Sequence, residues 1–110
     1  MKVLIFGLNT VEEIDEVINF LIDKGEIPML FTLVTGGIRG QEKESATAAW
    51  AKKNGCPLEY AMYDNGQQLV SSLGRRADYL VMRAQTGLPQ WQKNLMMQMK
   101  SEGKHGYVIR

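Results

Sequence analysis

The sequence predicts an α/β protein, with a mostly parallel five-stranded sheet and helices on both of its faces. Short apolar runs that suit buried strands alternate along the chain with segments whose apolar residues recur at helical spacing. Strands separated by helices imply right-handed crossovers and parallel pairing. No repeat or low-complexity segment interrupts this alternation. We therefore expect one Rossmann-like domain of three layers over residues 1–110.

The first half of the chain shows a strand, a helix and a second strand. The apolar run Lys2–Phe6 predicts the first strand. Thr10 and Glu13 form a capping box, in which the threonine caps a helix and the glutamate reaches back to it. Gly25 is placed to end that helix. Leu30–Val34 predicts the second strand. The apolar stripe of the helix comprises Val11, Ile14, Val17, Ile18, Leu21 and Ile22.

The second half continues the alternation with three helices and three strands. A helix with small residues around Trp50 is expected to lie close to the sheet, and Pro89 suits the first turn of the last helix. The expected elements are a helix over Gln41–Lys53, a strand over Leu58–Met62, a short helix ending near Gly74, a strand within Asp78–Arg83, a helix ending at Gly103 and a strand over Gly106–Ile109.

Composition places the chain among ordinary globular domains. It has 110 residues, of which 45% are hydrophobic and 23% charged, enough for a core of its own. No apolar run approaches the roughly 20 residues that cross a bilayer. The apolar start Met1–Gly7 is too short for a signal peptide. We therefore expect a cytoplasmic protein with no membrane partner. With one cysteine and one histidine, we expect neither a metal site nor a bound cofactor.

The most informative stretch is Thr35-Gly36-Gly37-Ile38-Arg39-Gly40, which separates an expected strand from an expected helix. Glycines let the backbone turn sharply and approach a ligand closely. The start of the helix supplies free N–H groups and partial positive charge to a phosphate. Arg39 offers a bidentate contact to the same anion. An ordinary tight turn with a surface arginine has the same pattern, so the motif is a hypothesis.

Ligands of open α/β sheets bind at the carboxyl ends of the strands. Four expected loops lie at that edge: Gly7–Thr10, Thr35–Gly40, Met62–Gly66 and Arg83–Leu88. Asn9 is placed there to hydrogen-bond a ligand, and Arg83 to face an anion. A purely structural role for Asn9 and a solvated position for Arg83 are the alternatives.

Several of these residues also resemble a known family. The start Met1–Gly7 with Asn9-Thr10, the sequence Gly36-Gly37-Ile38-Arg39-Gly40, Trp50-Ala51 and the run Ala77–Val81 resemble the small YspA-like branch of the SLOG superfamily. The likeness covers nearly the whole chain. It implies a Rossmann-like domain that binds nucleotides or nucleotide-derived ligands. Relatives include the Lonely Guy phosphoribohydrolases and the DNA-processing protein A.

The chain departs from that family where catalysis would take place. The catalytic branch has a second glycine motif and a glutamate after the fourth strand, and here only Thr86-Gly87 remains of it. Glu42 and Glu44 are the candidate catalytic acids. We therefore expect binding without turnover, as in a sensor or a sequestering protein, with nucleotide N-glycoside hydrolysis as an alternative. The expected ligand residues are Gly7, Asn9, Thr35, Gly36, Gly37, Ile38, Arg39, Gly40, Arg83, Thr86 and Gly87.

Charge is distributed unevenly and bears on possible partners. Residues 1–30 are mainly acidic and residues 65–110 mainly basic, a pattern that suits a nucleic acid or a second subunit. An interaction module that uses the basic half is therefore a further alternative, ranked below ligand binding. Methionines beside the core stripe of the last helix, Met96 and Met97, predict a homodimer through that helix.

Overall fold

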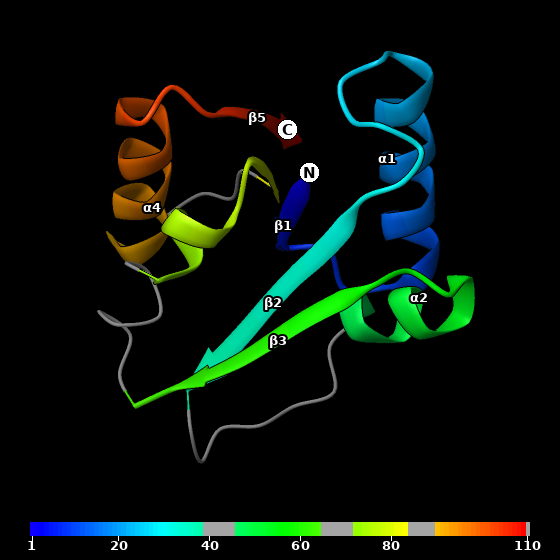
Figure 1. The fold of residues 1–110 in the computed structure, drawn as a ribbon, viewed down its shortest axis with the longest axis horizontal. Coiled ribbons are helices and arrows are strands. Elements are labelled where there is room, and N and C mark those ends of the chain that lie inside the picture. The colour runs from blue at the N-terminus through cyan, green and yellow to red at the C-terminus, as the bar shows by residue number, and fades with distance from the viewer. Residues whose placement is uncertain (39–45, 65–71, 84–89, 110) are drawn as a thin grey trace.

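The computed structural model describes residues 1–38, 46–64, 72–83 and 90–109 (Figure 1). Strands and helices alternate as expected. The elements are β1 (Lys2–Phe6), α1 (Val11–Asp23), β2 (Thr32–Ile38), α2 (Ala46–Asn54), β3 (Leu58–Tyr63), β4 (Tyr79–Arg83), α4 (Gln90–Ser101) and β5 (His105–Ile109). A further helical segment occupies residues 72–76.

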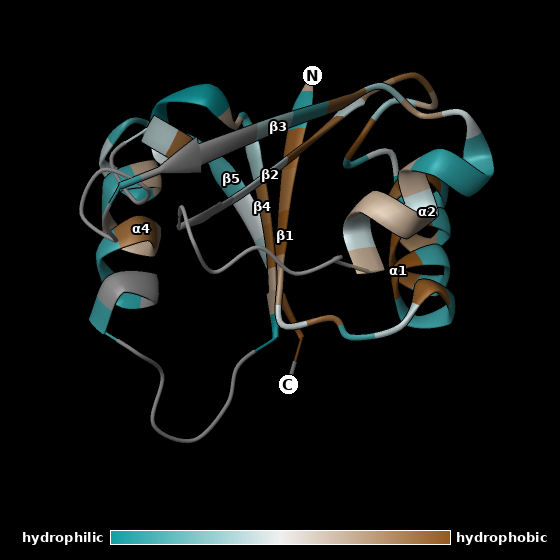
Figure 2. Ribbon diagram, turned by 90° about the horizontal axis from the view of Figure 1, so that it is seen from below, coloured by the Kyte–Doolittle hydropathy of each residue, from teal (hydrophilic) through white to brown (hydrophobic). Residues whose placement is uncertain are grey.

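The five strands form one sheet in the order β3-β2-β1-β4-β5. All four pairings between neighbouring strands are parallel, which confirms the predicted fold class. Viewed edge-on in Figure 2, the sheet separates α1 and α2 on one face from α4 on the other. The chain is therefore an α/β protein of three layers, consistent with a Rossmann-like arrangement.

Each face of the sheet has its own hydrophobic core, because successive strand residues point to opposite faces. Val3, Ile5 and Leu33 pack against α1 and α2. Leu4 and Val34 face the other way, against α4 and the segment 72–76. The six strand residues predicted to be buried are all buried: Val3, Ile5, Leu33, Val34, Leu80 and Val81.

The start and end of α1 follow the sequence signals. The side chain of Thr10 accepts a hydrogen bond from the Glu13 N–H at 3.1 Å, which confirms the N-cap. At the other end Gly25 has φ +74°, a left-handed conformation that glycine adopts without steric cost. These two signals fix both ends of the helix that follows β1.

The second strand differs from its prediction, because it starts two residues later and continues through the glycines. Leu30 is 88% exposed and lies before the strand, whereas Gly36 and Gly37 pair with β3 opposite Ala61 and Met62. The predicted loop Thr35–Gly40 was therefore wrong for its first four residues, Thr35 to Ile38, which belong to β2. Pairing with a neighbouring strand can therefore continue a strand through two glycines.

The last helix matches its prediction closely. Leu95 and Met99 are buried in the core under α4, and Gly103 follows the helix with φ +74°. Met96 packs against that core, while Met97 is 69% exposed. One outward methionine is compatible with an interface but does not establish one, so the homodimer stays a prediction. In the part of the chain that the structure describes, no helix is long and apolar enough to span a membrane.

Candidate functional site at the carboxyl edge of the sheet

The crossovers change direction between β1 and β4, which lie side by side in the middle of the sheet. The chain leaves β1 for α1 on one face, and the helix that follows β4 covers the opposite face (Figure 2). The two connections separate at the carboxyl ends of these strands, and ligands of open α/β sheets bind at such a point. The candidate site therefore lies at the carboxyl ends of β1 and β4.

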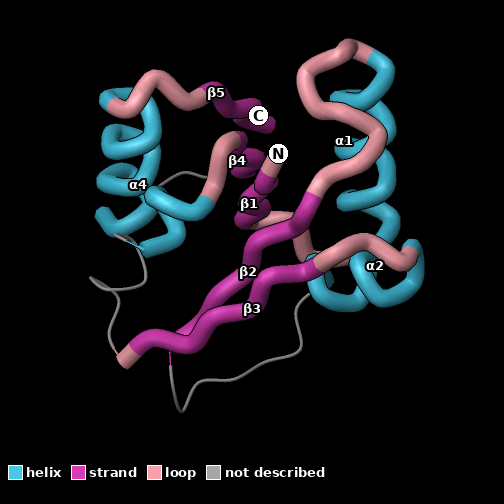
Figure 3. The backbone as a smooth tube through the Cα atoms, viewed as in Figure 1, coloured by secondary structure: helices cyan, strands magenta, loops and turns pink. Residues whose placement is uncertain are grey.

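The sheet also forks at this edge, between β1 and β2. Their pairing ends at Leu4 opposite Val34, whereas β2 stays paired with β3 as far as Ile38 and Tyr63. On the other side, β1 stays paired with β4 as far as Phe6 and Met82. Figure 3 shows β2 and β3 running away together from the other three strands.

Beyond the last β1–β2 pair, the backbone N–H of Gly36 points from β2 toward β1. Thr32 N–H donates to the carbonyl of Met1 at 2.9 Å, so it points toward β1, and Leu33 N–H donates to Pro57 on the other side. Backbone groups alternate in direction along a strand, so the N–H of Gly36 points toward β1 as Thr32 does. Backbone N–H groups without a sheet partner are donors for a ligand anion.

Gly7 ends β1 at the point where the crossovers separate. Its φ is +81°, which strains any residue with a side chain. A Cβ at this position would lie 3.0 Å from the Cβ of Arg83 and 3.3 Å from its backbone nitrogen. The end of β4 is therefore as close to Gly7 as packing permits, and only glycine lets the chain turn here into α1.

Arg83, at the end of β4, forms an ion pair with Glu13 of α1. The two side chains are 35% and 30% exposed, so water screens the pair and it contributes at most about 1 kcal/mol of stability. Glu13 thus makes two interactions: its side chain pairs with Arg83, and its backbone N–H donates to the side chain of Thr10. The predicted site residue Arg83 lies at this edge as expected, and Asn9, in the same turn as Gly7, is exposed.

The starts of the two helices on this face differ in charge. The first turn of α1 carries two acids, Glu12 and Glu13, which complement its partial positive charge. The first described turn of α2 carries none. A phosphate would be repelled by the acids of α1, whereas carboxylates accept hydrogen bonds from ligand hydroxyls. The edge thus has an acidic part, at the start of α1, and a part with glycine backbone, at Gly36 and Gly37 of β2.

A contact that the sequence did not reveal joins α2 to α1. The indole N–H of Trp50 donates to the Asp15 carboxylate at 3.1 Å, and its ring stacks on Phe31 with centroids 6.1 Å apart. Trp50 is only 6% exposed. The only sequence signal for this contact was an acid on the polar face of α1, and α1 carries several such acids. The contact therefore holds α2 in place against α1.

Six of the predicted site residues lie outside the described part of the chain: Arg39, Gly40, Glu42, Glu44, Thr86 and Gly87. Their predicted roles therefore stay predictions. Among the described residues, Gly7, Asn9 and Arg83 gather at the ends of β1 and β4, while Thr35, Gly36, Gly37 and Ile38 lie in the part of β2 that borders the fork. The structure thus brings the turn after β1, the end of β4 and the last part of β2 to one edge of the sheet.

The remaining reactive side chains lie away from this edge. Cys56, in the turn before β3, donates from its thiol to the carbonyl of Phe31 at 3.4 Å. Burial raises the pKa of this thiol, and a backbone hydrogen bond at Leu33 opposes that effect. The thiol therefore stays protonated and a poor nucleophile at neutral pH. No group of three potential metal ligands occurs within the described residues.

Comparisons with protein-family models, curated proteins and solved structures found no match to this chain. The resemblance to the YspA-like branch therefore rests only on the residues that suggested it. The forked edge and the side chains around it are the features of this chain that bear on its function.

Proposed function

We propose that the protein binds a small nucleotide or nucleotide-derived ligand at the carboxyl edge of its sheet. The observation that carries this proposal is the fork between β1 and β2, which borders Gly7 and directs the Gly36 amide away from the β2–β3 pairing. Glycine backbone at a crossover reversal leaves room and donors for a ligand. In the family that the sequence resembles, this combination serves nucleotides.

The charges around the fork favour one orientation of such a ligand. The acidic first turn of α1 repels a phosphate but accepts hydrogen bonds from sugar hydroxyls, as acids do in dinucleotide-binding folds. The phosphate then belongs with the Gly36 amide of β2, and we assign Arg39 to the same phosphate. Arg83 is already balanced by Glu13, so it contributes little net charge to an anion.

The first prediction concerns Arg39. Replacing it with alanine should weaken the binding of adenosine monophosphate by about 1.5–3 kcal/mol, because a charge-assisted hydrogen bond to the phosphate is lost. Isothermal titration calorimetry measures this directly. Arg76→Ala is the matched control, since Arg76 is an exposed arginine after the segment's core residue Leu73. Identical titration curves for wild type and Arg39→Ala would reject the assignment of Arg39 to the phosphate.

The second prediction is binding without hydrolysis. Cleavage of an N-glycosidic bond needs a carboxyl group placed at the bond for acid–base work, and Glu13, the acid facing β4 at this edge, is held by Arg83. Adenosine monophosphate incubated with the protein should release no free adenine in chromatographic assays. Adenine release that disappears in Glu42→Gln or Glu44→Gln would contradict this and indicate a phosphoribohydrolase.

A further inference from the structure

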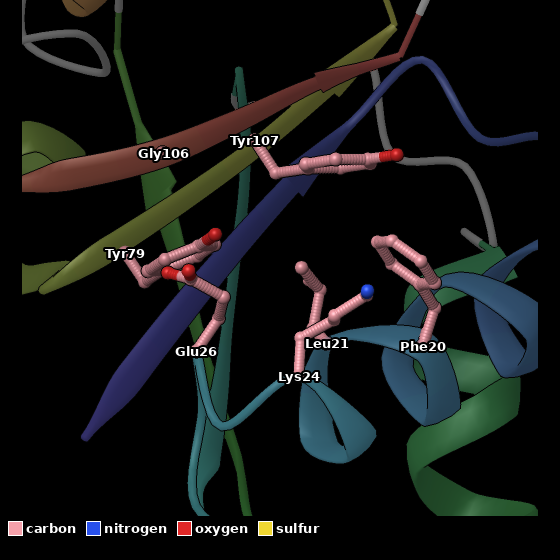
Figure 4. Close-up of a pocket in the computed structure, with 7 residues that line it drawn as sticks. All are labelled: Phe20, Leu21, Lys24, Glu26, Tyr79, Gly106 and Tyr107. Carbon is pink, nitrogen blue, oxygen red and sulfur yellow. The ribbon is translucent and has the colours of Figure 1, made fainter.

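A pocket lies at the amino-terminal ends of β4 and β5, away from the fork. Its volume is about 300 Å³, and it is lined by residues of the last turn of α1, of the segment after it and of the two strands. Figure 4 shows two aromatic side chains, Phe20 and Tyr107, on one side and Tyr79 with Glu26 on the other. Small-molecule pockets begin near this size, at about 300 Å³.

The aromatic side of the pocket offers a surface for a flat ring. Phe20 and Tyr107 contact each other with ring centroids 5.6 Å apart and planes tilted by 43°. Phe20 is nonetheless 42% exposed, so part of its ring remains uncovered. Exposed aromatic faces gain free energy when another ring covers them.

The opposite side holds the hydroxyl of Tyr79. Tyr79 is 3% exposed, and among the described residues nothing forms a hydrogen bond with its hydroxyl. Buried polar groups are normally paired, so such a group calls for a partner from outside the protein. Burial raises the pKa of this phenol, and the nearby charge of Glu26 raises it further. The hydroxyl is therefore a lasting hydrogen-bond donor beside a carboxylate acceptor.

The pocket carries one charge of each sign, Lys24 and Glu26, so its lining has no net charge. The Lys24 ammonium lies 5.7 Å from the centroid of the Phe20 ring and opposes a cationic ligand. Glu26, on the other side, opposes an anion. A neutral ring that carries polar groups on one edge avoids both penalties.

We propose that this pocket binds a neutral heteroaromatic base with an exocyclic amino group, an aminopurine or an aminopyrimidine. The ring covers Phe20 and Tyr107. The amino N–H donates to the Glu26 carboxylate, and the adjacent ring nitrogen accepts from the Tyr79 hydroxyl. This inference does not depend on the proposed function at the carboxyl edge, because the two sites lie at opposite ends of the strands.

The experiment is a titration of the ¹⁵N-labelled protein with adenine, followed by NMR. Adenine should shift the amide of Gly106, which lines the pocket, and leave the amide of Gly7 unchanged. Hypoxanthine, which has a carbonyl in place of the amino group, should bind at least tenfold more weakly. Tyr79→Phe should also lower adenine affinity at least tenfold without lowering the unfolding temperature, because the hydroxyl it removes bonds to no described residue.

Two further variants separate recognition from general charge effects. Glu26→Gln should weaken adenine at least tenfold, whereas Asp23→Asn, a neighbouring exposed acid that does not line the pocket, should leave it unchanged. Equal affinity for adenine and hypoxanthine would overturn the proposal, as would unaltered binding to Tyr79→Phe. A Gly106 amide that does not move at saturating adenine, or that moves with a simple alkylamine instead, would overturn it too. Failure of adenosine monophosphate to shift Gly7 would count against the carboxyl-edge site alone.

Discussion

Trp50→Ala should lower the free energy of unfolding by about 3–5 kcal/mol, the range for removal of a large buried aromatic side chain. Trp50 is 6% exposed and stacks on Phe31, so the substitution leaves a cavity between α2 and the sheet. It also removes the indole donor to Asp15, the hydrogen bond that joins α2 to α1. Urea denaturation followed by circular dichroism measures the loss.

Trp50→Phe is the control for this prediction. It keeps an aromatic ring against Phe31 but removes the hydrogen bond, which is worth about 1 kcal/mol, so it should cost clearly less than the alanine variant. A loss below 1 kcal/mol for Trp50→Ala would mean that α2 does not pack as described. It would also mean that the Trp50 contacts do not hold α2 in place against α1.

Gly7→Ala should lower the free energy of unfolding by about 2–5 kcal/mol, from two separate costs. A left-handed φ costs an alanine about 1–2 kcal/mol, and an added methyl group in a packed site costs about 1–3 kcal/mol. The methyl group would meet the Cβ and the backbone of Arg83. These atoms belong to the end of a central strand and cannot swing aside as the tip of a side chain does.

Gly25→Ala isolates the first of these costs. Gly25 has φ +74° with no atom within 4 Å of an added Cβ, so its substitution should cost only about 1–2 kcal/mol. The difference between the two variants measures how closely β4 approaches the end of β1. Equal losses in thermal or urea denaturation would show that the two strand ends do not approach each other as closely as described.

The sequence predicted most of the fold because its local signals agree with one another. Thr10 and Gly25 mark both ends of α1, and the apolar runs around Val3, Leu33 and Val81 are the centres of three buried strands. Burial on both faces makes parallel strands continuous apolar runs, which are easy to recognise.

The site was harder to predict, because its geometry depends on contacts between distant segments. Glycine pairs usually mark turns, but Gly36 and Gly37 continue β2, because β2 stays paired with β3 as far as Ile38. The pairing of Arg83 with Glu13 joins residues 70 apart in sequence, and no local pattern specifies it. The hydrogen bond from Trp50 to Asp15 is of the same kind. The sequence predicted that Gly7, Asn9 and Arg83 lie at the carboxyl edge, where the structure places them, but it predicted a loop where β2 continues and gave no sign of the fork in the sheet.

The most direct test of the central claim is an NMR titration of glycine-labelled protein with adenosine monophosphate. The chain has 11 glycines, and those that the structure describes lie at both edges of the sheet, so each of their amides reports on its own location. Binding at the fork should shift Gly7 and Gly36 most and leave the turn glycines Gly55 and Gly103 unchanged. Inorganic phosphate alone should move Gly36 more than Gly7, since the acids of α1 repel it. Saturating nucleotide that leaves both Gly7 and Gly36 unshifted would contradict ligand binding at the carboxyl edge.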